Sequence, residues 1–127
     1  MSRSAKRLIL SALTAVMAAA SLTVVTAPQA SAINRVECNG RTDFLQIGAH
    51  PSGSTTGSTF CYANAGESTF QPWWDDYAWV TWLSTGNNRV QYHADGNWQP
   101  GTPINKWTYY VWDHHPGGVK VDRIRIH

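Results

Sequence analysis

The chain after residue 32 consists of short runs of aromatic and β-branched residues, separated by clusters rich in glycine, proline, asparagine and serine. Such runs are typical of strands, and such clusters are typical of turns. This part lacks the 3.6-residue spacing of an amphipathic helix, although residues 68–76 could carry a single short turn. The pattern predicts an all-β fold with strands over residues 35–38, 43–47, 58–64, 77–83, 89–93, 106–112 and 119–126.

The two halves of this region resemble each other. Residues 45–47 (Leu-Gln-Ile) recur 45 positions later as residues 90–92 (Val-Gln-Tyr), and the pattern of residues 77–84 is matched 42 positions later by residues 119–126. A motif of about 40 residues that occurs twice predicts two four-stranded units packed as one β-sandwich.

The same repeat predicts where the last strand of each unit bends. Its alternation of inward and outward residues slips at Val80-Thr81 in the first unit and at Asp122-Arg123 in the second. A slip of this kind predicts a bulge or bend in each strand. We assign to the core four large side chains that alternate or follow the repeat: Tyr77, Trp79, Trp82 and Tyr92.

Residues 1–32 predict a secretory signal peptide. A positively charged start and a mostly apolar stretch over residues 8–27 are followed by Ala30-Ser31-Ala32, which fits the small-residue cleavage pattern. About twenty apolar residues can also span a bilayer, but the cleavage pattern favours an exported protein over an integral membrane protein. Cleavage would leave residues 33–127, enough for one compact domain but not for two.

Removal of the signal peptide changes the charge of the protein. The whole chain carries a formal charge of +2, but without Arg3, Lys6 and Arg7 seven basic residues face eight acidic ones, which gives −1. A nearly neutral domain argues against nucleic acid or an anionic membrane as the main partner.

The chain has two cysteines, Cys38 and Cys61. In an oxidising compartment such a pair predicts a disulfide. Closing a loop of about 24 residues should stabilise the domain by about 3 kcal/mol. The pair lacks the C-x-x-C spacing of redox and metal sites, which favours a structural bond.

Catalytic motifs are absent from the sequence. It contains no G-x-S-x-G, no H-E-x-x-H and no glycine-rich phosphate loop. His114-His115 and Asp75-Asp76 are adjacent pairs that invite a metal or an acid–base role, but no third ligand or partner is placed by spacing. We predict a protein that is not an enzyme and that has no cofactor and no metal.

Three motifs in order resemble a known family: Cys61-Tyr62-Ala63-Asn64-Ala65-Gly66, then Ser84-Thr85-Gly86-Asn87-Asn88, and finally Val121-Asp122-Arg123-Ile124-Arg125-Ile126. They resemble secreted βγ-crystallin-fold proteins of the Streptomyces killer-toxin-like type, over essentially all of residues 33–127. The resemblance implies a βγ-crystallin-like sandwich of two Greek-key motifs. Relatives with this fold include proteins toxic to yeasts and fungi, a metalloproteinase inhibitor and calcium-binding crystallins, so the fold alone does not decide the function.

Aromatic residues are the strongest compositional signal, with seven Trp, five Tyr and three Phe. A core of this size does not readily hold all of them, so some should reach the surface, where Trp and Tyr favour sugar rings and protein partners. We predict an antifungal or antimicrobial protein that contacts a wall or surface component of its target cell. The predicted contact residues are Trp73, Trp74, Trp98, Tyr110 and Trp112.

Two other functions stay open at this point. A protease inhibitor needs a rigid exposed loop, whereas the segment between the cysteines is rich in Gly, Ser and Thr. A calcium-binding crystallin needs adjacent Asn or Asp, followed after two residues by Ser or Thr and then Ser. When the repeats are aligned on Trp82 and Ile124, the family positions hold Asp76, Tyr77, Val80 and Thr81 in one unit and Gly118, Val119, Asp122 and Arg123 in the other. No feature of the sequence predicts the oligomeric state.

Because neither unit keeps the oxygen ligands that calcium requires, we expect the mature domain to be indifferent to calcium. Calorimetric titration with CaCl2 should give no binding tighter than about 100 μM, and calcium should leave the melting temperature unchanged. Tighter binding with a rise in melting temperature would contradict the expectation.

Overall fold

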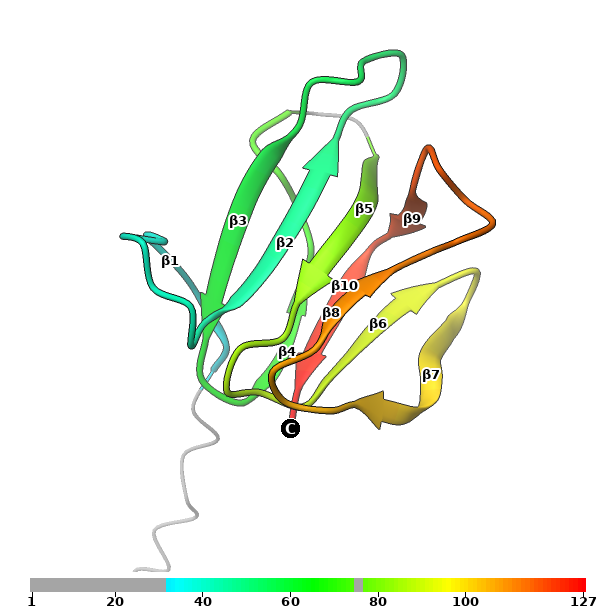
Figure 1. Ribbon diagram of the computed structural model, residues 1–127. Coiled ribbons are helices and arrows are strands. Elements are labelled where there is room, and N and C mark those ends of the chain that lie inside the picture. The colour runs from blue at the N-terminus through cyan, green and yellow to red at the C-terminus, as the bar shows by residue number, and fades with distance from the viewer. Residues whose placement is uncertain (1–31, 75–76) are drawn as a thin grey trace, which may run out of the picture.

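The computed structural model describes residues 32–74 and 77–127. The predicted signal peptide, apart from Ala32, lies outside the described residues, as do Asp75 and Asp76. The described residues form ten strands in two antiparallel sheets (Figure 1). In this part of the chain no helix is long and apolar enough to cross a membrane.

Six of the strands form the larger sheet. Its order is β1-β3-β2-β5-β8, and β9 also pairs with β5. The smaller sheet has the order β4-β10-β6-β7. The bounds of the larger sheet's strands are β1 Asn34–Val36, β2 Leu45–His50, β3 Ser58–Ala63, β5 Ala78–Ser84, β8 Tyr109–Val111 and β9 Val119–Val121. Those of the smaller sheet are β4 Gly66–Thr69, β6 Val90–Ala94, β7 Asn97–Ile104 and β10 Arg123–Ile126.

The strand order shows two Greek keys that exchange one strand each. The first comprises β2 to β5, but its third strand, β4, pairs with β10 in the sheet of the second. The second comprises β6 to β10, and its third strand, β8, pairs with β5 in the sheet of the first. Each sheet is therefore completed by the other motif, which confirms the predicted sandwich of two four-stranded units.

Two strands are missing from the sequence prediction, β4 and β7. Both are edges of the four-stranded sheet, and edge strands tolerate the polar and proline residues that obscure a strand pattern. β4 reads Gly-Glu-Ser-Thr and β7 contains Pro100 and Pro103. Asp95 and Gly96 form the turn between β6 and β7, and both residues have positive φ.

Both predicted bends are present. Gly48 pairs with Trp82 but Ala49 pairs with Val80, so Thr81 is an extra residue in β5. In the second motif the corresponding strand divides at Asp122 into β9 and β10, which belong to different sheets. The irregularity thus recurs at equivalent points of the two motifs.

The inward assignment of Tyr77, Trp79 and Trp82 is wrong. The buried side chains of β5 are Ala78, Val80 and Leu83, so the motifs superpose with an offset of 41 residues, Val80 on Val121 and Leu83 on Ile124. The alignment of the two halves by sequence has an offset of 42 residues. A shift of one residue moves every side chain of a strand to the other face, and Tyr92, assigned from a different strand, is indeed buried.

The core fills the space between the two sheets. Its buried side chains come mainly from β2, β3 and β5 on one side and from β6 and β10 on the other, with Thr85 as a fully buried polar residue. The largest fully buried side chains are Leu45, Ile47, Val80, Leu83, Thr85, Val90 and Ile124, together with Cys61.

The turn between the two motifs, residues 84–88, is held by hydrogen bonds on both sides. The Thr85 hydroxyl donates to the Asn105 carbonyl oxygen (2.8 Å) and accepts from the Thr108 N–H (2.9 Å). The Asn88 side-chain amide donates to the carbonyl oxygens of Asp43 (3.1 Å) and Thr85 (2.8 Å). We call residues 84–88 the connecting turn. Along the chain they lead from β5 to β6, and their hydrogen bonds tie them to the segments before β2 and before β8.

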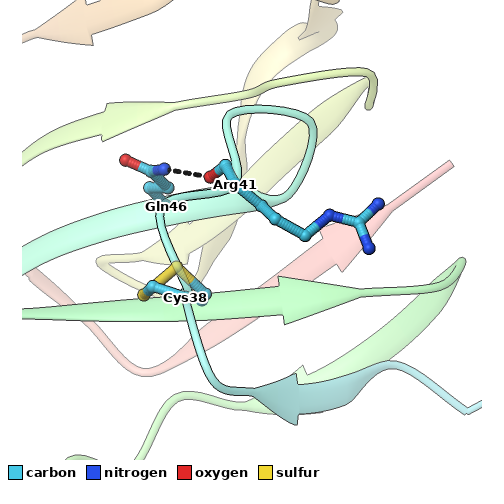
Figure 2. Close-up of a disulfide and its surroundings, with 4 residues drawn as sticks. Cys38, Arg41 and Gln46 are labelled. Atoms are coloured by element: carbon cyan, nitrogen blue, oxygen red, sulfur yellow. Dashed lines mark hydrogen bonds between the residues drawn. A yellow bond between two sulfur atoms is a disulfide. The ribbon is translucent and has the colours of Figure 1, made fainter.

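The disulfide predicted between Cys38 and Cys61 is present, with 5.3 Å between the Cα atoms. It ties the loop after β1 to β3. Beside it the Gln46 side-chain amide donates to the Arg41 carbonyl oxygen at 2.7 Å (Figure 2). Hydrogen bonds from the Arg41 guanidinium lower the pKa of the Asp43 carboxyl. These contacts close the loop over the outer side of the sheet.

Replacing Cys38 by serine should lower the free energy of unfolding by about 3 kcal/mol, because the unfolded chain loses its crosslink. Denaturant unfolding measures this loss. Intact-mass analysis of the wild-type protein should show no alkylation before reduction and two alkylated thiols after it. A variant that unfolds together with the wild type would remove the structural role of the bond.

The Thr85→Val substitution should cost about 2 kcal/mol, because it keeps the shape of the buried side chain but removes its part-buried hydrogen bonds to the Thr108 N–H and the Asn105 carbonyl oxygen. Thr59→Val is the matched control, since Thr59 is exposed on β3 and its replacement should change the free energy of unfolding by less than about 0.5 kcal/mol. Equal unfolding midpoints for the two variants would contradict this role of Thr85.

Candidate functional site on the outer face of the larger sheet

The outer side of the six-stranded sheet carries large aromatic side chains. On β5 the residues that alternate with the buried ones are Trp79 and Trp82. On the neighbouring strand β8 (Figure 1), Tyr109 and Val111 are 64% and 46% exposed. We call Trp79, Trp82, Tyr109 and Val111 the aromatic face.

Trp82 lies flat against the sheet because the residue opposite it is a glycine. A Cβ built on Gly48 would lie 2.0 Å from the indole nitrogen of Trp82, so no side chain fits there while the indole keeps its place. The other side of Trp82 meets Tyr109, with 5.7 Å between the ring centroids and 25° between the ring planes. Gly48 and Tyr109 together hold the indole in one orientation.

Charged residues are missing from the strands beneath the aromatic face. The four strands β2, β3, β5 and β8 read LQIGAH, STFCYA, AWVTWLS and YYV, without Asp, Glu, Lys or Arg. The nearest charged neighbour on β9 is Lys120, which pairs with Trp79 and has its ammonium over the Tyr77 ring at 3.0 Å. The central part of this surface therefore offers apolar rings, hydroxyls and amides rather than charge.

One end of the aromatic face is bounded by two loops. The Trp79 indole N–H donates to the Ser52 hydroxyl at 2.7 Å. The two ring nitrogens of His50 each lie 2.8 Å from a carbonyl oxygen, those of Pro51 and Gly117. A hollow of about 310 Å³ lies between these residues. The loops after β2 and before β9 are thus linked to each other.

The outer side of the four-stranded sheet has a different character. Trp98 lies beneath the guanidinium of Arg125, 3.9 Å from the ring centroid, and Arg123 lies 5.3 Å away. Both arginines pair with Glu67. Trp98 was predicted as a target contact; it is only partly exposed, and its ring lies against the arginines of an ion-pair network.

Histidines complete the network on this sheet. His93 Nδ1 lies 2.6 Å from the Asp122 carboxylate, and His127 Nε2 lies 2.9 Å from the Gln91 side-chain oxygen. Burial, with Arg125 and Arg89 nearby, lowers the pKa of His127. These groups satisfy one another and leave this face with compensated charges.

Trp73 and Trp74 differ in exposure, although their ring centroids lie 5.2 Å apart. Trp73 is 71% exposed, whereas Trp74 packs partly against the core, with its ring centroid 5.7 Å from that of Phe60. The Trp74 indole N–H donates to the Tyr77 carbonyl oxygen at 3.2 Å. Only Trp73 of this pair offers most of its indole to a partner.

Tyr110 and Trp112 belong mostly to the interior. Both pack against Tyr92, with ring centroids 6.2 and 5.1 Å away, and the Trp112 indole N–H donates to the Tyr92 hydroxyl at 2.9 Å. Burial raises the pKa of Tyr92, as it does for Tyr62. The predicted contact residues therefore lie in three separate ring clusters.

Sequence reasoning missed the residues of the aromatic face. It assigned Trp79 and Trp82 inward and did not single out Tyr109, Val111 or the 64% exposed Trp107. A signal was available, because β5 has small aliphatic residues on one side and Trp on the other. Both sides are apolar, so only the pairing of Trp82 with Gly48 shows which one faces outward.

The positions considered for calcium and metal binding have other partners. Val80 is buried in the core, Asp122 contacts His93, and Arg123 pairs with Glu67. His114 and His115 are exposed in the loop before β9. Within residues 32–74 and 77–127, no group of three or more His, Cys, Asp or Glu side chains could hold a metal.

Comparison with known protein families identifies the family to which this fold belongs. Residues 49–125, more than half of the chain, match the family model described as Beta/Gamma crystallin. Comparisons with curated proteins and with solved structures gave no match. The matched segment spans most of both Greek keys, including the connecting turn, and on this ground the chain belongs to the beta/gamma crystallin family.

Proposed function

We propose that the protein is a secreted, non-enzymatic binding protein of the killer-toxin-like type, which attaches to neutral polysaccharide in the wall of a target cell. The observation that carries the proposal is the Trp82 indole, seated on Gly48 and stacked beside Tyr109. Exposed aromatic patches mark interaction sites more often than isolated surface residues do.

The chemistry of the aromatic face favours a neutral ligand. A sugar ring presents a C–H face that packs against an aromatic ring, and its hydroxyls bond to neutral polar groups such as those around Trp82. An anionic or cationic ligand would find no opposite charge on β2, β3, β5 or β8. Export, supported by the predicted signal peptide and by the disulfide, would bring the protein to a cell wall.

Binding to insoluble yeast cell-wall glucan and chitin particles tests the proposal, alongside growth assays with yeasts, filamentous fungi and bacteria. Tyr109→Ala should reduce binding at least tenfold, because central aromatic contacts carry much of the free energy of association. Trp73→Ala removes an equally exposed ring elsewhere and should bind as the wild type does. Equal binding of the wild type and Tyr109→Ala would contradict the assignment of the face.

A protease panel run on the same preparation separates the proposal from its alternative. Inhibition of a metalloproteinase, without polysaccharide binding or growth inhibition, would replace the proposed function by that of a proteinaceous inhibitor.

The seat of Trp82 can be tested by a double-mutant cycle. Gly48→Ala should reduce polysaccharide binding about as much as Trp82→Ala, because the added methyl displaces the indole. In the double variant, Gly48→Ala should reduce binding little below that of Trp82→Ala alone. Circular dichroism and thermal melting of all three variants control for misfolding. Additive losses in binding would show that Gly48 acts independently of Trp82.

A further inference from the structure

Trp107 occupies a backbone conformation that its side chain disfavours. It lies between β7 and β8 with φ of 58°, in the left-handed region. The other non-glycine residues with positive φ in the described part are Asn39, Asn64 and Asp95, and Asn and Asp adopt this region most readily. A bulky aromatic residue is the exception in this set.

The side chain gains little from the domain in return. The Trp107 indole is 64% exposed, and within the described residues it makes no hydrogen bond and no ring contact. A buried tryptophan would offset an unfavourable backbone by removing a large apolar area from water. Here most of that area stays in water, so the side chain does little to offset the cost of the backbone conformation.

The conformation is imposed by the connecting turn. The Trp107 N–H donates to the Gly86 carbonyl oxygen at 2.7 Å. The next residue, Thr108, donates its N–H to the hydroxyl of the buried Thr85 at 2.9 Å. The backbone of Trp107 is thus held at a defined place, two residues before Tyr109 of the aromatic face.

We propose that Trp107 is a target-contact residue, held by the connecting turn at the end of the aromatic face. Local backbone strain in folded proteins is concentrated at functional positions, where it preorganises a contact. Glycine or asparagine would suit this backbone better, and a tryptophan here is accounted for by a contact outside the domain. The identity of the target, a neutral wall polysaccharide, rests on the proposed function.

The test uses variants in which stability and binding should change in opposite directions. Trp107→Asn and Trp107→Gly should raise the melting temperature, by about 4 °C for Trp107→Asn, and should reduce binding to glucan or chitin particles at least tenfold. Trp107→Tyr keeps a ring and should bind within about threefold of the wild type, with no gain in melting temperature. Asn64→Gly, at an exposed left-handed position, is the backbone control and should leave binding unchanged.

Each outcome bears on one of the two proposals. Wild-type binding by Trp107→Asn and Trp107→Gly, or a fall in their melting temperature, would overturn the role of Trp107, while loss of binding by Tyr109→Ala would still support the aromatic face. A wild type that binds no particles but inhibits growth would overturn the polysaccharide target, and growth inhibition by the same variants would then decide the role of Trp107. A wild type that does neither would overturn both.

Discussion

The hydrogen bonds of the connecting turn are the interaction on which the rest of this structure depends. Each sheet needs a strand from the other Greek key, so neither motif has a complete sheet alone. The Thr85 hydroxyl and the Asn88 amide tie the junction of the motifs to the segments that precede β8 and β2. A Cβ at Gly86 would lie 2.5 Å from the carbonyl oxygens of Asp43 and Phe44, which explains why glycine stands at this crossing. The Ser-Thr-Gly-Asn-Asn motif is therefore a structural element of the fold.

The two outer faces of the sandwich differ in their chemistry. On the four-stranded sheet Trp98 lies beside two arginines, Arg123 and Arg125, which both pair with Glu67. The central strands of the other sheet carry no charged residue and leave rings in contact with water. The outer face of the four-stranded sheet thus carries ion pairs, whereas the central strands of the larger sheet offer uncharged rings to a neutral partner. This asymmetry supports a binding function in a family whose fold alone does not define one.

The connecting turn also relates stability to the proposed contact surface. It places the start of β8, and therefore Tyr109, next to the end of β5, where Tyr109 stacks on Trp82. The same turn holds the backbone of Trp107 in the left-handed region. The hydrogen bonds of the connecting turn thus also fix the backbone positions of Trp107 and Tyr109. Such an arrangement is common where a binding surface must be rigid before its partner arrives.

The sequence by itself determined the class of fold, the disulfide and the twofold repetition. Strand composition, the two cysteines and the slips at Thr81 and Asp122 are local features, and local patterns survive in any tertiary context. The sequence pattern did not predict the edge strands β4 and β7, because they pair on one side only and carry polar residues or proline.

Only the tertiary structure decided which side of β5 faces water. With Trp on one side and Ala, Val and Leu on the other, both sides are apolar, and alternation separates two faces without saying which is buried. Volume decided the outcome. The buried side chains of β5 and of its neighbour β2 are small and medium aliphatics, and Gly48 on β2 provides a seat for the Trp82 indole outside. Gly48 and Trp82 are far apart along the chain, as are Trp82 and Tyr109, so the candidate site exists only once the strands have paired.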